Sequence, residues 1–419
     1  MVNEDIELKY LSKIGVSDDK LLDAVTDEAK RHCFNLRERG ELFFQQAAQG
    51  SRPVITIPGE TLSHCWEKAC ISVLALGSTV PTYYDHLDKQ GKSIHVGSRE
   101  AKVIMQIQHP FDPRVHKDFP GGIDNLVDYA GEVIDGNGDH EMMPFEDLVV
   151  ALRTRDPETL EALKKKWEGK WKYTYHERLT AYPTVLPTGE VVRVNQFEQM
   201  QEKLKREPLS KSVQAATWVP LLDHNEGIRY RDNQGVERLF KFNDYDSPCF
   251  QRFWYRLTPC NGQRGGGYRA DVDTDWRSRD LYKAVLMNDF AFMMWHLILN
   301  KKVEQNLNAP VYEGYHNDHS NSLHWYGYYI DPQHPDQRNE AKKNLNDILR
   351  MIHEPTETRL WAPNPSLPKS EDQYYFAVMD TALETMETCR NQMRSIGKDP
   401  MKLDYLSREN PLFPIEQAE

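Results

Sequence analysis

The sequence lacks the features of membrane-spanning and secreted proteins. No stretch of its 419 residues approaches the roughly 18 consecutive apolar residues that cross a bilayer. The first residues, MVNEDIELKYLSK, contain no basic stretch followed by an apolar one, as a signal peptide has. We therefore expect a protein of a cytoplasmic compartment that neither spans a membrane nor is secreted.

Cysteines are few, and their spacing does not suit metal binding. The six cysteines form no CxxC pair and no Cys/His ladder of zinc spacing. A chain of this length can bury a large core and does not need disulfides for stability. We expect reduced thiols, no metal site and one or two domains.

The sequence also has no excess of positive charge. Its 52 Lys and Arg against 64 Asp and Glu give a formal net charge of -12. Nucleic-acid binders rely on clustered basic residues to neutralise phosphates, so the balance argues against a general polyanion binder. A single nucleotide needs only a few local cations and remains a possible ligand.

Apolar periodicity predicts an α/β chain without internal repeats. Residues 3–50 show the three- and four-residue spacing of helices, with Gly50 as a stop. The expected organisation is a helical N-terminal extension (1–52), a main domain (53–353) with insertions near 223–246 and 259–270, and a helical C-terminal addition (354–419). Strands are predicted at 54–57, 101–108, 213–222, 249–258 and 272–276, a loop at 109–122, a hairpin at 224–246, and helices at 61–77, 122–135, 156–169, 194–208, 280–302 and 372–397.

Residues suited to nucleotide chemistry gather between Ser247 and Tyr326. Cys249 begins an aromatic strand, the pair Arg277-Ser278 is suited to gripping phosphate, and Asn288 offers both a donor and an acceptor to a base. Together these residue types describe a nucleotide site with a nucleophile.

In their order along the chain, these motifs resemble the thymidylate synthase superfamily, which includes pyrimidine nucleotide hydroxymethylases. The motifs are Pro-Cys before an aromatic strand, Arg-Ser-x-Asp at 277–280, Asn288 and His-x-Tyr at 324–326. Residues 119–136 and 172–183 resemble the long archaeal and phage branch, and the similarity covers about residues 53–331. The resemblance implies an α/β fold with a large, mostly antiparallel sheet, flanking helices and a homodimer formed through sheet faces, in a host cytoplasm if a phage encodes the chain.

The resemblance also implies a role for each residue. Cys249 attacks C6 of the pyrimidine as a thiolate, which makes C5 a carbon nucleophile, and 5,10-methylenetetrahydrofolate supplies the carbon. Glu132 and Tyr175 match the other catalytic residues, and Asp280 matches a folate contact. The implied contacts to a pyrimidine nucleoside monophosphate are Arg99, Arg277, Ser278, Asn288, His324, Tyr326 and, across the dimer, Lys211.

Each residue also has an ordinary alternative role. A cysteine at a strand start is usually a small core residue, and Arg277 with Asp280 could form a surface ion pair. The remaining alternatives are a satisfied polar group on a helix for Asn288, a packed aromatic cluster for His324 and Tyr326, a solvated acid for Glu132 and a core residue for Tyr175. The ordered set of motifs favours the nucleotide site.

Three departures from the family pattern bear on the reaction. Lys211 stands where two adjacent arginines are usual, so a charge is kept but the bidentate fork is lost. Phe250 stands where a histidine commonly follows the nucleophile. The final residues, NPLFPIEQAE, lack the apolar tail that closes over folate, and a different closure would let water add to give a hydroxymethyl product.

We therefore expect folate-dependent C5 hydroxymethylation, with dUMP as the first candidate substrate. Asn288 suits the O4 and N3-H pattern of uracil, although Asp289 beside it leaves the register open. The alternatives are reductive methylation of dUMP by a thymidylate synthase, hydroxymethylation of a cytosine nucleotide, and a non-catalytic nucleotide-binding homologue.

Overall fold

The structure, a computed structural model, describes residues 8–360 apart from 46–50, 83–86, 91, 113, 140–141, 143, 155, 169, 172, 189, 224–226, 233, 242–246 and 261–265. Two compact units divide the chain. Unit 1 comprises residues 1–126, 273–293 and 313–377, and unit 2 comprises 127–272, 294–312 and 378–419. The boundaries between the units fall within strands β11 (Tyr268–Trp276) and β13 (Val311–Trp325) and within helix α10 (Val285–Leu307).

The main sheet has the strand order β1-β2-β4-β13-β11-β10-β7, with β3 beside β4 and β12 beside β13. In unit 1, β4 (Ser98–Ile107) runs parallel to β2 (Val54–Gly59) and antiparallel to β13. The short strands β1 (Phe43–Gln45) and β3 (Ser78–Val80) add antiparallel pairs, and β12 (Arg279–Asp280) adds a parallel one. The predicted α/β class, with a large, mostly antiparallel sheet and flanking helices, is confirmed.

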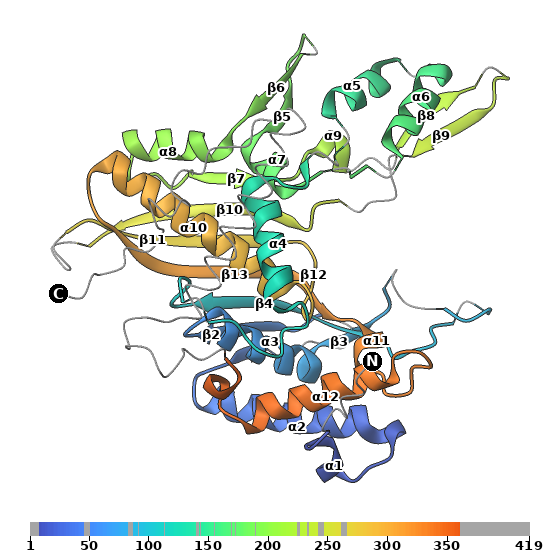
Figure 1. Cartoon of the computed structure of the whole chain (residues 1–419), viewed down its shortest axis with the longest axis vertical. Coiled ribbons are helices and arrows are strands. Elements are labelled where there is room, and N and C mark those ends of the chain that lie inside the picture. Colours follow the sequence, from blue (N-terminus) through green and yellow to red (C-terminus); the bar gives the residue numbers. More distant parts are fainter. Residues whose placement is uncertain are drawn as a thin grey trace. The chain divides into compact units, whose positions relative to one another are not determined.

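Helices cover one face of the unit 1 sheet. Helix α3 (Leu62–Leu76) packs on β2 and β4, and α2 (Asp18–Glu38) and α12 (Arg338–His353) pack on α3 (Figure 1). Every second residue of β4 is buried beneath them: Ala101, Val103, Met105 and Ile107. Because α3 lies between the sheet and two helices, it is buried on nearly every side, which explains its apolar sequence. Short turns of helix complete unit 1: α1 (Leu11–Ile14), α11 (Gly327–Ile330) and η3 (Thr356–Arg359).

Unit 2 pairs β10 (Phe250–Pro259) antiparallel with β7 (Gln214–Ala216). Two further antiparallel hairpins are β5 (Tyr182–Val185) with β6 (Val191–Val194), and β8 (Gly227–Arg231) with β9 (Glu237–Lys241). Its helices are α5 (Phe145–Thr154), α6 (Pro157–Trp167), α7 (Tyr175–Thr180), α8 (Gln196–Arg206), α9 (Pro220–Asp223) and most of α4 (Gly122–Asp135).

The N-terminal helix is shorter than predicted. It was expected to continue to Gly50 but ends at Glu38, where Gly40 adopts a left-handed φ of 74°. The amides of Gly40 and Glu41 then donate to the carbonyls of Arg37 and Leu36, the bonding of a Schellman C-cap. The chain beyond this turn forms β1, a strand of the main sheet.

Most other predicted elements are confirmed. Strands β2, β4, β7, β10 and β11, helices α3, α4, α6, α8 and α10, the loop after β4 and the hairpin of β8 and β9 lie where expected, although β7 covers only three residues and α9 follows it. Helices α5, α7 and α12 and strands β5, β6 and β13 were not predicted. The helix predicted at 372–397 lies outside the described residues, and the three-segment division of the chain stays a prediction. No helix within the described ranges combines the length and apolarity needed to cross a membrane.

A buried ionic cluster attaches the end of the described chain to α3. Glu67 accepts hydrogen bonds from Arg359 (Nε to Oε1, 2.7 Å), from Thr356 (Oγ1 to Oε2, 2.6 Å) and from His116. Burial alone raises the pKa of Glu67, but the hydrogen bond from His116 and the charge of Arg359 outweigh it and the pKa is lowered. The carboxylate is therefore held in its charged form.

We predict that Arg359→Met lowers the free energy of unfolding by about 3–5 kcal/mol, because it leaves a buried carboxylate without its cation. Urea unfolding followed by circular dichroism measures the loss. Arg31→Ala, which removes an exposed pair with Glu28, is the matched control and should cost less than about 1 kcal/mol. Equal losses in the two variants would contradict the stabilising role of the Glu67 cluster.

Candidate active site

Cys249 lies half-buried in unit 2, directly before β10. The next residue, Phe250, donates its backbone N–H to the hydroxyl of Tyr175 at 3.2 Å. This hydrogen bond places the phenol beside Cys249. Burial, together with the neighbouring Cys249, raises the pKa of Tyr175, so the phenol stays protonated at neutral pH. The structure thus brings together two of the three predicted catalytic residues.

Two further tyrosines belong to this site. Tyr173 shares a hydrogen bond with Tyr175, and its pKa is raised by burial and by interactions with Tyr175, Cys249 and Tyr129. We call Tyr129, Tyr173 and Tyr175 the tyrosine cluster. Thr174 has extended backbone angles, so Tyr173 and Tyr175 project to the same side. The Tyr-x-Tyr spacing before α7 was a signal for Tyr173 that the sequence analysis did not use.

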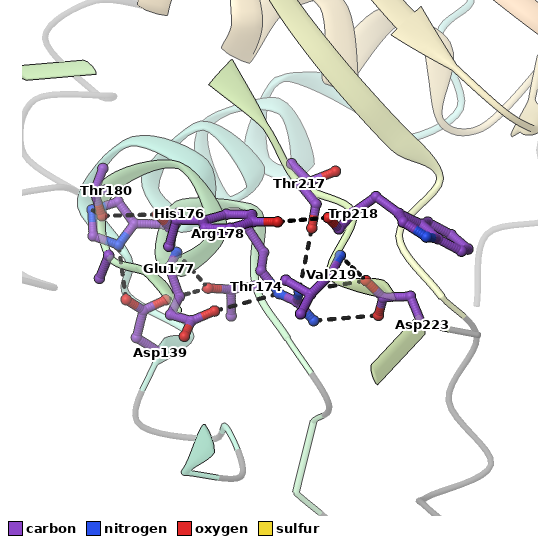
Figure 2. A network of polar contacts seen from close by, with 12 residues as sticks. Asp139, Thr174, His176, Glu177, Arg178, Thr180, Thr217, Trp218, Val219 and Asp223 are labelled. Carbon is purple, nitrogen blue, oxygen red and sulfur yellow. Dashed lines mark hydrogen bonds and ion pairs between the residues drawn. The ribbon is translucent and has the colours of Figure 1, made fainter. Parts of the chain in front are cut away.

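Glu132 lies on α4, one helical turn after Tyr129. Burial, together with the negative charge of Asp139, raises the pKa of Glu132 from 4.5 to about 7. An acid with a pKa near neutrality can both give and take a proton at physiological pH, which suits general acid–base catalysis. Asp139 is itself held by His176 (Nδ1 to Oδ2, 2.8 Å) and by Thr174, the N-cap of α7 (Figure 2).

The predicted phosphate contacts Arg277 and Ser278 are half-buried in unit 1, between β11 and β12. The residue after them, Arg279, is almost fully buried and binds Asp289 (Nη1 to Oδ1, 2.6 Å), Asp318 and Ser320 (Nη2 to Oγ, 2.9 Å). Its guanidinium also lies 4.4 Å from the ring centroid of Trp276. Arg279 therefore fixes the backbone that carries Arg277 and Ser278.

The same contacts bear on which residue reads the base. Asp289 is fully buried and bound to Arg279, and burial raises its pKa against the opposing charge of Arg279. Asn288 is buried to 5% exposure on α10, and successive side chains of a helix point about 100° apart. The Asp289 carboxylate is thus bound to Arg279 in the protein interior, and a role of Asn288 in reading the base stays a prediction.

His324 is placed to accept a hydrogen bond. Its Nδ1 lies 3.3 Å from the carbonyl oxygen of Ser322, which only accepts, so the proton resides on Nδ1. Burial lowers the pKa of His324 in spite of nearby Asp280, which keeps the ring neutral. Within the described part of the chain, the buried Nε2 has no hydrogen-bond partner. The ring centroids of Tyr326 and His324 lie 4.6 Å apart in an edge-to-face arrangement, so the two predicted residues are in contact.

The other predicted site residues have local contacts of their own. Asp280 accepts from the amides of Tyr282 (2.9 Å) and Lys283 (3.1 Å) and from the hydroxyl of Tyr329 (3.1 Å). Arg99 donates to Thr79 Oγ1 (2.7 Å) and pairs across the strands with Trp325, next to His324. Lys211 is exposed in unit 2, and its carbonyl oxygen accepts from Trp254 at 2.8 Å.

The predicted residues thus fall into two sets. Unit 2 contains Cys249, Tyr175, Glu132 and Lys211, and unit 1 contains Arg99, Arg277, Ser278, Asp280, Asn288, His324 and Tyr326. Their catalytic and binding roles stay predictions. Within the described ranges, no group of three or more His, Cys, Asp or Glu side chains is arranged to hold a metal ion.

The chain is similar to a solved structure of the thermostable thymidylate synthase A from Bacillus subtilis. The TM-score is 0.38 at 13% sequence identity, over 65% of this chain and 82% of that one. No family model matches the sequence, and no curated protein matches it. A likeness this distant identifies neither a family nor a reaction.

We predict that Glu132→Gln stabilises the protein at high pH. Because the folded-state pKa of about 7 lies above the ordinary 4.5, the wild type loses free energy of unfolding as pH rises through this range. Glutamine cannot ionise, so above pH 7 the variant should be more stable than wild type by up to about 3 kcal/mol, and the difference should vanish near pH 4. Urea unfolding at both pH values measures it.

Glu202→Gln, at an exposed position of α8, is the control and should show no such pH dependence. A Glu132→Gln variant whose stability follows that of wild type at both pH values would contradict the raised pKa.

Proposed function

We propose that the protein transfers a one-carbon unit from a reduced folate to C5 of a pyrimidine nucleotide, through a covalent adduct between Cys249 Sγ and C6. The substrate we name is dUMP, and the product is its 5-hydroxymethyl derivative. The observation that carries the proposal is the hydrogen bond from the backbone N–H of Phe250 to the Tyr175 hydroxyl, because it holds a phenol beside the residue that carries the candidate nucleophile, Cys249. When bound, the folate supplies the carbon at the oxidation level of formaldehyde.

In this proposal the residues of unit 2 perform the bond making. The Cys249 thiolate adds to C6, which places electron density on C5 and makes it nucleophilic. C5 then takes the one-carbon unit and loses its proton, tetrahydrofolate would leave, water would supply the hydroxyl group, and expulsion of the thiolate from C6 would regenerate Cys249. Glu132 holds and moves the protons that this sequence requires, since its pKa of about 7 lets it exchange them near neutral pH. Tyr175, which stays protonated, donates a hydrogen bond or relays a proton from C5.

The residues of unit 1 bind and orient the nucleotide. Arg277 and Ser278 contact the phosphate, Asn288 reads the base, and His324 Nε2 accepts from a sugar hydroxyl. Arg99, Tyr326 and Lys211 are further nucleotide contacts by the same resemblance. The orphaned acceptor on His324 supports this assignment, because a buried acceptor without a partner is costly unless a ligand supplies the donor.

Asp280 is compatible with a folate contact. Its carboxylate already accepts three hydrogen bonds, two on Oδ1 and one on Oδ2. A carboxylate has about four acceptor positions, so one position on Oδ2 can take an N–H of the pterin ring. The residues therefore fit the group, with Tyr329 fixing the orientation of the carboxylate.

We also propose a homodimer formed through the sheet face opposite α3. Lys102, Ile104 and Gln106 of β4 are half-buried on that face, as are Asn317 and His319 of β13. The face carries polar pairs within the sheet, such as Gln106 to Asn317 (3.4 Å) and Asn317 to Asp273 (2.7 Å). A half-buried, partly apolar face of this kind suits contact with a second copy, and Lys211 would serve the phosphate across the dimer.

We predict that 5-fluoro-dUMP, incubated with wild-type protein and methylenetetrahydrofolate, forms an adduct that survives denaturation. Fluorine at C5 cannot leave as a proton does, so the Cys249 adduct cannot resolve. Intact-protein mass spectrometry detects the adduct, which Cys249→Ser should lack and Cys260→Ser, a variant of another half-buried cysteine, should retain. Folded wild-type protein that forms no adduct would rule out the proposed covalent chemistry.

We predict that Asn288→Asp shifts the preference from dUMP toward dCMP. A carboxylate accepts from the amino group of cytosine but leaves O4 of uracil without a donor, so the ratio of kcat/KM should change by about 10- to 100-fold. Asp289→Asn is the matched control, and its ratio should stay within about threefold of wild type because Arg279 holds that residue. A shift confined to the Asp289 variant would mean that Asp289 reads the base.

A further inference from the structure

A buried arginine organises the chain around Cys249. Arg178, on α7, has a side chain 1% exposed, and its partner Asp223 has a side chain 0% exposed. We propose that Arg178 and Asp223 are positioning residues that hold the Cys249 segment, residues 247–251, in the geometry needed for attack. This deepens the function proposed above, and its kinetic test rests on that function.

The guanidinium fixes the loop that follows β7 together with the short helix α9, residues 217–223, which we call the Thr217–Asp223 loop. Arg178 Nη1 donates to the carbonyl oxygen of Thr217 at 3.2 Å, and Nη1 and Nη2 donate to Asp223 at 3.4 and 3.3 Å (Figure 2). Asp223 Oδ2 also accepts from the amide of Val219 at 2.6 Å. Both ends of the Thr217–Asp223 loop are therefore bound to the same buried guanidinium.

This loop holds the Cys249 segment on both sides of the cysteine. Before it, Ser247 Oγ donates to the carbonyl oxygen of Asp223 at 2.8 Å. After it, the Thr217 hydroxyl donates to the carbonyl oxygen of Phe250, and the Thr217 amide donates to that of Gln251 at 3.1 Å. Cys249 lies between these two attachments, so its backbone position depends on the loop that Arg178 orders.

A second set of contacts reaches the same segment through the tyrosine cluster. The Arg178 guanidinium lies 5.6 Å from the ring centroid of Tyr173, within reach of a cation–π interaction. Tyr173 bonds to Tyr175, whose hydroxyl accepts the N–H of Phe250. Arg178 thus supports both the backbone around Cys249 and the phenol next to its thiol.

An ordinary core ion pair is the alternative to a positioning role. Replacing a buried ion pair by apolar residues often leaves stability unchanged, so burial alone does not define the role of Arg178. A positioning role makes a specific prediction about kinetics. Loss of Arg178 should slow bond making at Cys249 and preserve nucleotide binding, since, among the residues that the structure describes, none of the proposed nucleotide contacts is held by Arg178.

The experiment compares Arg178→Met with wild type by steady-state kinetics on dUMP, nucleotide affinity by calorimetry, and amide hydrogen exchange of residues 247–251. We expect kcat to fall by about 10- to 100-fold, since a displacement of about 1 Å can cost that much, with dUMP affinity within about threefold. Exchange at Phe250 and Gln251 should accelerate at least about tenfold, while exchange in β4 stays unchanged. Arg178→Lys, which keeps a charge but not the fork, should recover part of kcat.

Arg359→Met is the matched control, since it removes an equally buried arginine of unit 1 from its carboxylate. Below its unfolding temperature it should keep wild-type kcat and wild-type exchange at residues 247–251. If Arg178→Met does not fold, Thr217→Val removes only the hydroxyl bond to Phe250 and should lower kcat by about 3- to 10-fold. A folded Arg178→Met or Thr217→Val protein with wild-type kcat would overturn the proposal.

The two proposals fail in different ways. Wild-type protein that forms no adduct and no product would end the proposed function, and hydrogen exchange would then decide the positioning role alone. Amide hydrogen exchange at residues 247–251 that is the same in Arg178→Met as in wild type would overturn the proposed positioning role of Arg178.

Discussion

A guanidinium taken out of water must find fixed carboxylate or carbonyl partners, and this requirement shapes the structure at three places. Arg279 meets it with Asp289 and Asp318, Arg178 with Asp223 and the Thr217 carbonyl, and Arg359 with Glu67. Each arginine joins segments that are distant in the sequence, because its planar fork can bind two groups at once. The segments that carry Cys249 and the pair Arg277 and Ser278 are attached to two of these clusters.

The two clusters have parallel consequences for the proposed chemistry. In unit 1, Arg279 fixes the backbone of Arg277 and Ser278 and binds Asp289, the neighbour of Asn288, which we propose reads the base. In unit 2, the loop closed on Arg178 holds the chain before and after Cys249. The proposed phosphate contacts are thus supported by buried Arg279, and the proposed nucleophile by buried Arg178. Bond making requires that reacting groups be held rigidly in a fixed geometry.

The sequence predicted the elements with a clear apolar period and the residues with a distinctive motif. Helices α3 and α10 and strands β4 and β10 were found in this way, although the aromatic strand begins at Phe250, one residue after Cys249. Strand β13 was missed because its inward-facing residues include His316, Asp318 and Ser320, which Thr274 and Arg279 satisfy instead of apolar contacts. The roles of Arg178 and Asp223 were missed because their hydrogen-bond partners lie 39 to 45 positions away in the sequence, and no local sequence pattern indicates such contacts.

The central claim is that the chain places a one-carbon unit on C5 of a pyrimidine nucleotide. The most direct measurement is mass spectrometry of the nucleotide after incubation of the purified protein with methylenetetrahydrofolate and, separately, dUMP, UMP, dCMP or CMP. The account predicts a 5-hydroxymethyl product from dUMP. A methyl product together with dihydrofolate would support one-carbon transfer to C5 but show that the product is not hydroxymethylated. Folded protein that leaves all four nucleotides unchanged would contradict the account.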